Sequence, residues 1–323
     1  MTTSDARAML RLPAREIPVP TSVSEQARAI LALGPLFATP QWPPLDDPEA
    51  WRALIAELDG TALRMAPGSG AHAEVEEIPV GRARVLAITP DGVEPGDRRV
   101  YLEIHGGAFI QGGGELCRTR GIDNAYRVGV HSWSVDYRMP PDHPFPAALD
   151  DCLAAYRALL ERRDAGEIVV GGVSAGANLA AATVLRARDE GLPLPAGVVL
   201  ATPAADLTES GDTWQTNLGL DNLLAPSPAP LLYAAGHDLR DPYLSPVFGD
   251  FTAGFPPAIL LSGTRDVLLS DTVRLHRALR AADVPADLHV WEAASHGGFL
   301  GRAPEDDERT REIRRFLARC RPA

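Results

Sequence analysis

The sequence predicts an α/β protein in which helices flank a mostly parallel β-sheet, and three observations lead to this prediction. Short aliphatic runs alternate with longer helical patterns along most of the 323 residues, as expected for parallel strands joined by helical crossovers. The length is sufficient for one large domain with an inserted segment. Finally, the run 168–170 enters Gly172-Val173-Ser174-Ala175-Gly176 and an Ala-rich helical pattern follows, which places a serine at a sharp strand-to-helix turn.

The N-terminal part contains two predicted helices before any strand, and we expect residues 1–60 to form part of a cap over the sheet. Ser22-Val23-Ser24-Glu25 matches a capping box and predicts a helix that Gly34-Pro35 ends. Asp47-Pro48 begins a second helix, which the pattern ends at Gly60. Simple packing on the flank of the sheet is the alternative use of this segment.

Residues 61–203 and 244–323 are expected to form the α/β core. The core begins with a hairpin of two strands, after which strands and helices alternate. The predicted strands are 77–80, 84–88, 99–104, 133–137, 168–170, 198–201, 258–261 and 288–291. The predicted helices of the core are 146–163, 175–190, 270–282 and 305–320.

Residues 204–243 interrupt this alternation and are predicted to form a cap insertion. The segment has no clear strand, is broken by three prolines, and holds many large apolar residues. An insertion of this length at the carboxyl end of a strand is typical of an active-site lid. A plain surface excursion is the alternative, but it would not need so many apolar side chains.

Composition excludes several classes of partner. The net charge of −12 argues against nucleic acid and anionic membrane surfaces, and favours a small neutral or cationic molecule. Three scattered cysteines are too few for a disulfide framework or a zinc site. No run has the layout of a secretory signal or the length of a membrane span, so we expect a cytoplasmic protein.

The candidate nucleophile is Ser174, and it needs a base that an acid orients. In this architecture the three residues follow in the order serine, acid, histidine, each after a strand. Asp266 directly follows the strand 258–261, and His296 follows the strand 288–291 with Gly297 and Gly298 beside it. Among the competitors, Asp271 is interpreted as the N-cap of the next helix, and His289 as a structural histidine within a strand.

The loop after the third strand is the candidate oxyanion hole. It reads His105-Gly106-Gly107-Ala108-Phe109, and its glycines allow the backbone to approach a substrate. The N–H groups of Gly106, Gly107, Ala108 and Ala175 are the candidate donors to a developing negative oxygen. Gly106 could instead be only a flexible turn, and His105 is interpreted as a residue that fixes the loop.

These motifs together resemble the hormone-sensitive-lipase-like family of α/β-hydrolases, also called bacterial family IV esterases. The resemblance runs from about residue 75 to the end. It rests on residues 105–109, the run 136–148, the Ser174 motif, Ser245-Pro246, Asp266, and 296–299. It implies an α/β-hydrolase fold with an eight-stranded sheet and a helical cap, and carboxylester hydrolysis through an acyl-enzyme without metal or organic cofactor.

Three positions depart from the family pattern. Ala108 stands where the family usually has a third glycine, Val173 where it usually has an acid, and Ala177 where it usually has another glycine. The methyl group of Ala108 narrows the space beside the oxyanion hole. No triad member is lost, but the departures weaken any transfer of substrate range.

We therefore predict a serine esterase for small hydrophobic esters of short to medium acyl length. The candidate pocket residues are Phe109, Phe37, Trp42, Trp214 and Leu218. A lactone or amide hydrolase with the same triad is the first alternative, and a non-catalytic ligand-binding member of the fold is the second. An exposed edge strand could support a homodimer.

Overall fold

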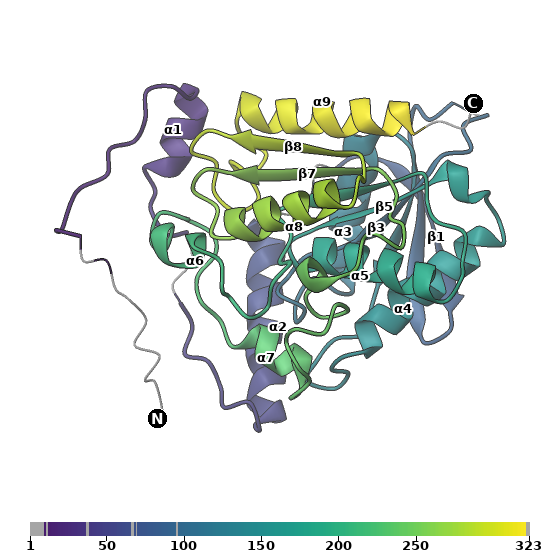
Figure 1. The fold of residues 1–323 in the computed structure, drawn as a ribbon, viewed down its shortest axis with the longest axis horizontal. Helices are drawn as coiled ribbons and strands as arrows, with labels where there is room; N and C mark the ends of the chain where they lie inside the picture. The colour runs from purple at the N-terminus through teal and green to yellow at the C-terminus, as the bar shows by residue number, and fades with distance from the viewer. Residues whose placement is uncertain are drawn as a thin grey trace.

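The protein is built around an eight-stranded sheet with the strand order β1-β2-β4-β3-β5-β6-β7-β8, shown in Figure 1. The computed structural model describes residues 10, 12–36, 39–65, 68, 70–94 and 96–320. The strands are β1 (Ala73–Val80), β2 (Ala83–Pro90), β3 (Val100–Ile104), β4 (His131–Asp136), β5 (Ile168–Val173), β6 (Gly197–Ala201), β7 (Ala258–Gly263) and β8 (Ala286–Trp291).

All strand pairs from β4 to β8 are parallel, whereas β2 runs antiparallel to both of its neighbours. The predicted hairpin and the predicted mostly parallel sheet are therefore confirmed. Because neighbouring parallel strands end at the same edge, the loops after β3, β5, β7 and β8 meet there. In Figure 1 the arrowheads of β7 and β8 point to the side on which α1 and α6 lie.

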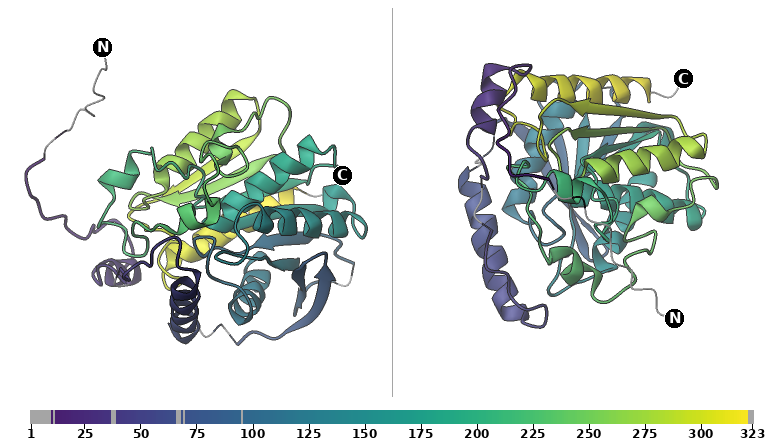
Figure 2. Two further views of the ribbon diagram at one scale, coloured as in Figure 1. Left: turned by 90° about the horizontal axis from the view of Figure 1, so that it is seen from below. Right: turned by 60° about the vertical axis from the view of Figure 1, so that its left-hand side comes forward.

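Helices cover both faces of the sheet. The longer ones are α2 (Pro48–Met65), α3 (Glu115–Val128), α4 (Ala147–Leu160), α5 (Ala175–Asp189), α8 (Leu269–Ala281) and α9 (Pro304–Arg319); the shorter ones are α1 (Glu25–Leu31), α6 (Thr213–Thr216), α7 (Ala229–Ala234) and the 3₁₀ turns η1 (Ala165–Glu167) and η2 (Pro246–Phe248). Apolar residues of α4, α5 and α8 form the larger core cluster on one face. The ends of α3 and α9 form a smaller one on the other, and the views of Figure 2 show these two layers.

Two helices differ from the sequence prediction. The helix α3 was not expected, because Gly121 lies in its middle and its composition is polar. That glycine permits close packing: a Cβ there would lie 2.5 Å from the Ser134 hydroxyl oxygen of β4. The helix α2 continues past Gly60 to Met65, so the predicted end at that glycine is wrong.

The N-terminal helices pack at the carboxyl edge of the sheet. Residues of α1, among them Ala27 and Ile30, pack with Phe299 and Ala303. In α2, Trp51 is fully buried among residues that include Ile110 and Leu232 of α7. Both helices thus lie against the loops that carry the candidate site.

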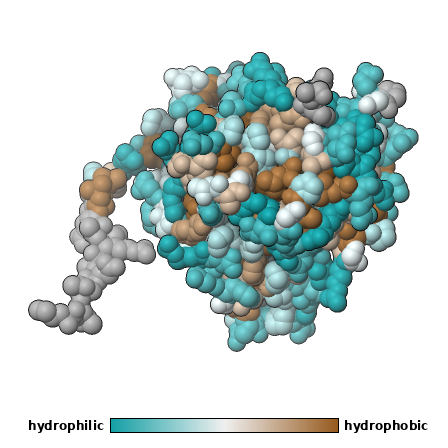
Figure 3. Space-filling view, turned by 45° about the vertical axis from the view of Figure 1, so that its right-hand side comes forward, coloured by the Kyte–Doolittle hydropathy of each residue, from teal (hydrophilic) through white to brown (hydrophobic). Residues whose placement is uncertain are grey.

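One face of the molecule is mainly hydrophilic. Figure 3 shows one face on which charged and polar residues predominate and apolar residues form interrupted patches. Among the described helices, none is both long and apolar enough to cross a bilayer.

The cap of α1 is Ser24 rather than the predicted pair Ser22 and Glu25. The Ser24 hydroxyl accepts the N–H of Ala27 at 3.1 Å. The reciprocal carboxylate comes from Glu305 in α9, which accepts the backbone N–H and the hydroxyl of Ser24 at 2.7 and 2.8 Å. A long-range contact therefore replaces the local capping box.

Replacing Ser24 by alanine should lower the free energy of unfolding by about 1–2 kcal/mol, because the cap and the link to Glu305 are both lost. The matched change at the exposed Ser22 should cost less than about 0.5 kcal/mol. Urea titrations of both variants measure the difference. Equal destabilisation by the two changes would contradict the assignment of the cap.

Candidate active site

Ser174 stands at a strained corner between β5 and α5. Its φ of 60° and ψ of −122° are conformations that L-residues rarely adopt. The flanking glycines allow the corner to form: a Cβ on Gly172 would lie 2.4 Å from the carbonyl oxygen of Ile104, and one on Gly176 would lie 2.0 Å from it. The corner presents the serine hydroxyl at the N-terminus of α5, whose dipole favours negative charge there.

Asp266 and His296 lie in contact at the same edge of the sheet. The Nδ1 atom of His296 is 3.2 Å from Oδ1 of Asp266. Asp266 is fully buried, and its carboxylate accepts hydrogen bonds from the Ser262 hydroxyl at 2.8 Å and from the N–H of Leu268 at 2.9 Å. These donors hold the acid in one orientation toward the histidine.

The pKa of His296 is raised above its ordinary value of 6.5. Burial alone would lower it, because the charged ring loses water. The hydrogen bond and charge of Asp266, together with the charge of Asp221, outweigh burial and stabilise the protonated ring. A histidine of this kind can take a proton near neutral pH and hold it.

The loop 105–109 approaches the Ser174 corner with an unusual backbone. Gly107, Ala108 and Phe109 have φ values of 131°, 52° and 65°. The carbonyl oxygen of Gly107 accepts the N–H groups of residues 110 and 111, which closes the turn. Among the hydrogen bonds of the described residues, none uses the N–H of Gly107, Ala108 or Ala175, so these donors remain available to a ligand.

His105 fixes the base of this loop, as the sequence predicts. Its ring stacks on Tyr137 with the ring centroids 4.1 Å apart, and the Tyr137 hydroxyl donates to the carbonyl of His105. Because the carbonyl of Gly106, 2.9 Å from Nδ1, can only accept, Nδ1 carries the proton. Burial lowers the pKa of His105 to about 4, so the ring is neutral near pH 7.

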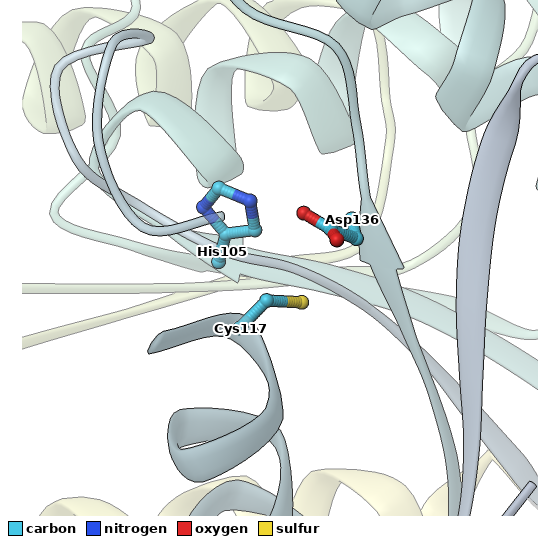
Figure 4. A group of neighbouring side chains, drawn as sticks. All are labelled: His105, Cys117 and Asp136. Atoms are coloured by element: carbon cyan, nitrogen blue, oxygen red, sulfur yellow. The ribbon is translucent and has the colours of Figure 1, made fainter. Parts of the chain in front are cut away.

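His105, Cys117 and Asp136 form a group whose ligand atoms lie within 4.8 Å of one another. In Figure 4 the His105 ring and the Asp136 carboxylate face each other above the Cys117 thiol. The carboxylate is already paired with Arg84 at 2.6 Å and accepts the N–H of Gly114. Burial raises the pKa of the Cys117 thiol. An arginine at the carboxylate and a protonated thiol disfavour a cation, so we interpret the group as support for the loop.

A small cavity of about 40 Å³ opens beside Ser174. Ala108, Phe109 and Ala175 line one side, and Trp214 and Leu224 of the segment 204–243 line another. The methyl group of Ala108, which stands where the family usually has a glycine, therefore narrows this cavity, as the comparison with the family pattern indicated.

Of the other three pocket residues predicted from the sequence, two lie outside the cavity and one is not among the described residues. Trp42 stacks on Trp51 with the ring centroids 5.8 Å apart and does not line the cavity. Leu218 is 49% exposed and lies outside it as well. Phe37 lies outside the described residues.

Sequence reasoning misassigned one carboxyl group near the site and missed another. Asp271 is fully buried and accepts the N–H of Asp206 at 3.0 Å, whereas the N-cap position of α8 is Leu268, which makes no side-chain cap. The interpretation of Asp271 as an N-cap is therefore wrong. Asp221, in the segment 204–243, is 3% exposed, and its link to the site had no sequence signal, because that link runs through the distant backbone N–H groups of Val267 and His296.

Two other histidine rings make contacts away from the site. The Nε2 atom of His276 lies 3.2 Å from the carbonyl oxygen of Ala286. His289 stacks on Trp291 within β8, in agreement with its interpretation as a structural residue.

Comparisons with known proteins identify the family of this fold. The model of an α/β-hydrolase-fold family matches residues 101–300. The crystal structure of an esterase, E25, superposes with a TM-score of 0.87 at 36% identity, covering 96% of this chain and 98% of that one. The chain belongs to the hormone-sensitive-lipase-like α/β-hydrolases.

Other α/β-hydrolases of this kind resemble the chain over most of their length. The "Acetyl-hydrolase" of Streptomyces hygroscopicus is 36% identical over 64% of this chain and 71% of its own. The "Carboxylic ester hydrolase LipN" of Mycobacterium tuberculosis is 30% identical over 78% of this chain and 73% of its own. As a member of this family, the protein is a carboxylesterase-type hydrolase.

The buried His105 should make the stability of this hydrolase depend on pH. The unfolded ring binds its proton near pH 6.5 and the folded ring only near pH 4. The free energy of unfolding should therefore fall by up to about 3 kcal/mol as pH drops from 6.5 to 4, with no contribution from His105 above that range.

Urea titrations at pH 4.5 and 7 compare the wild type with a His105→Gln variant. The variant should lose part of this pH dependence, although its stability at pH 7 also falls because the stacking on Tyr137 is lost. His289→Gln in β8 is the matched control and should keep the dependence. The same pH dependence in His105→Gln as in the wild type would refute the prediction.

Proposed function

We propose that this protein is a serine carboxylester hydrolase with Ser174 as nucleophile, His296 as general base and Asp266 as the orienting acid. The observation that carries the proposal is the buried contact of Asp266 with His296 at the sheet edge where the Ser174 corner presents its hydroxyl. The raised pKa of His296 and the unused N–H groups beside the serine support it.

The proposed reaction begins when His296 takes the proton of the Ser174 hydroxyl as its oxygen attacks the ester carbonyl. Asp266 accepts from Nδ1–H of His296, which directs Nε2 at the serine and stabilises the imidazolium. The N–H groups of Gly107, Ala108 and Ala175 stabilise the negative oxygen of the tetrahedral intermediate. His296 then protonates the leaving alcohol, and water repeats the sequence to release the acid.

The cavity beside Ser174 supports the proposal that the substrate carries a small hydrophobic acyl group. Its walls include Phe109, Leu207, Trp214 and Leu224, and its volume is about 40 Å³. Apolar walls favour apolar acyl groups, and the small volume favours short ones over long ones.

The pocket walls also support a division into domains. Trp214 and Leu224 belong to residues 204–243, and residues 1–60 contain most of α2, whose Trp51 packs against Ile110 of the loop after β3. We assign both segments to a cap, and residues 61–203 and 244–323 to the α/β-hydrolase core. Strand β8 ends the sheet with Val290 40% exposed, and this edge is the surface we propose for a homodimer.

Replacing Ser174 by alanine should lower kcat for p-nitrophenyl acetate by at least about 10⁴-fold, because the other groups alone retain little catalysis. A fluorophosphonate probe should label the wild type and not the variant. Esterase activity close to that of the wild type in the variant would overturn the proposed nucleophile. Failure of the probe to label the wild type would instead favour a non-catalytic ligand-binding protein.

Assays of a panel of lactones beside linear esters distinguish a lactone hydrolase from an esterase. A kcat/KM for lactones well above that for acetate and butyrate esters would make the protein a lactone hydrolase with the same triad. An amide panel separates amide hydrolysis in the same manner.

Trp214→Ala should widen the acyl cavity and raise the kcat/KM of p-nitrophenyl hexanoate relative to acetate by about tenfold. Leu218→Ala is the matched control, since Leu218 lies in the same segment but outside the cavity, and should change this ratio by less than about twofold. An unchanged ratio in Trp214→Ala would remove this side chain from the acyl pocket.

A further inference from the structure

One carboxylate of the cap segment joins the loop that carries Asp266 to the loop that carries His296. The Oδ2 atom of Asp221 accepts the backbone N–H of Val267 at 3.1 Å and that of His296 at 3.2 Å. Its Oδ1 atom accepts the N–H groups of Leu223 and Leu224 at 3.0 and 3.1 Å. Each oxygen therefore has two donors, and all four are backbone groups.

The next residue extends this junction to the N-terminal segment. The side-chain amide of Asn222 donates to the carbonyl of Ile30 in α1, and the backbone carbonyl of Asn222 accepts the N–H of Leu36 at 2.7 Å. Its N–H lies 3.5 Å from the hydroxyl of Ser295, next to His296. Residues 221–222 thus contact both cap segments and both loops of the proposed acid–base pair.

The charge of Asp221 also acts on His296. Burial raises the pKa of Asp221, and the attraction of His296 opposes this shift. The charged groups that face His296 are Asp266 after β7, Asp221 from the cap, and Arg309 from α9, which is 3.7 Å from Asp306. Of these, the two aspartates favour the protonated ring and Arg309 disfavours it.

We propose that Asp221 is a positioning residue of the hydrolytic site, which holds the Asp266 and His296 loops at their working separation from within the cap. The inference rests on the proposed function, because it assigns Asp266 and His296 the roles given above. Asp221 does not touch the reacting atoms. It acts through the backbone N–H of His296 and of Val267, the residue after Asp266.

Only a carboxylate fits this position. A carboxamide would offer one oxygen to two of the N–H groups and turn its own NH₂ group toward the other two. Asp221→Asn therefore places donors against donors and removes one buried negative charge, with almost no change in volume. Displacement of catalytic groups by a fraction of an ångström to 1 Å is enough to lower rates strongly.

In the test, the full chain with Asp221→Asn should show kcat reduced about 10- to 100-fold, with KM changed by less than about threefold. The acid limb of the kcat/KM profile should shift to lower pH, because His296 loses a stabilising negative charge. The His296 pKa, followed by NMR in the same variant, should fall with it. Asp238→Asn is the matched control: the side chain of this exposed cap aspartate accepts the local N–H of Arg240, and loss of its charge should leave kcat and the pH profile unchanged.

A wild-type kcat in Asp221→Asn would overturn the inference. A reduced kcat with an unchanged His296 pKa would overturn it as well, because that result describes a merely structural residue. Should Asp221→Asn fail to fold in a thermal unfolding experiment, Asp221→Ser removes the charge and the bridge without adding an opposed amide, and the same criteria apply. The Ser174→Ala variant distinguishes failure of the positioning role from failure of the proposed function. An inactive Ser174→Ala variant beside a fully active Asp221→Asn variant would reject the positioning role and keep the proposed function.

Discussion

The close approach of α5 to the end of β3 is the constraint on which the rest of the site depends. At Gly176 the backbone comes so near the carbonyl oxygens of Ile104 and His105 that a Cβ would lie 2.0 and 2.5 Å from them. This proximity brings the Ser174 corner beside the loop 105–109, so that one contact brings the candidate nucleophile and the candidate oxyanion donors together. A larger side chain at residue 176 would move the candidate nucleophile away from the candidate oxyanion donors, although it would alter none of these groups chemically.

The buried carboxylates beside His296 are a second feature that determines the electrostatics of the site. Asp266 and Asp221 are both buried at the same sheet edge, and each accepts several hydrogen bonds from neutral donors rather than an arginine pair. An arginine partner would have satisfied either carboxylate, but it would also have cancelled the negative potential that His296 experiences. His296 therefore keeps the negative potential of both aspartates, and the charge of Arg309 opposes it.

The sequence predicted those features that local pattern controls. The strands were found within a few residues of their ends because aliphatic runs between turns specify buried strands, and the positions of Asp266 and His296 after β7 and β8 followed from that order. The helix α3 was missed because its central glycine serves packing against Ser134, which no local pattern reveals. Asp221 was missed for a related reason: the two partners that link it to the site lie 46 and 75 residues away and are backbone groups without a side-chain signature. The exposed Leu218 was predicted to line the pocket because apolarity alone cannot distinguish an inward from an outward residue in an irregular segment.

The junction at residues 221–222 has a consequence for how this enzyme can be altered. Residues 204–243 contribute pocket walls such as Trp214 and Leu224, which makes this segment a target for changing the shape of the pocket. Here the same segment also carries the carboxylate that bridges the loops of the core. A graft of residues 204–243 from another protein would change the shape of the pocket and, in the same step, the alignment of the groups behind it. The pocket wall and the hydrogen bonds to the loops after β7 and β8 therefore belong to one segment, and an exchange of this segment alters both together.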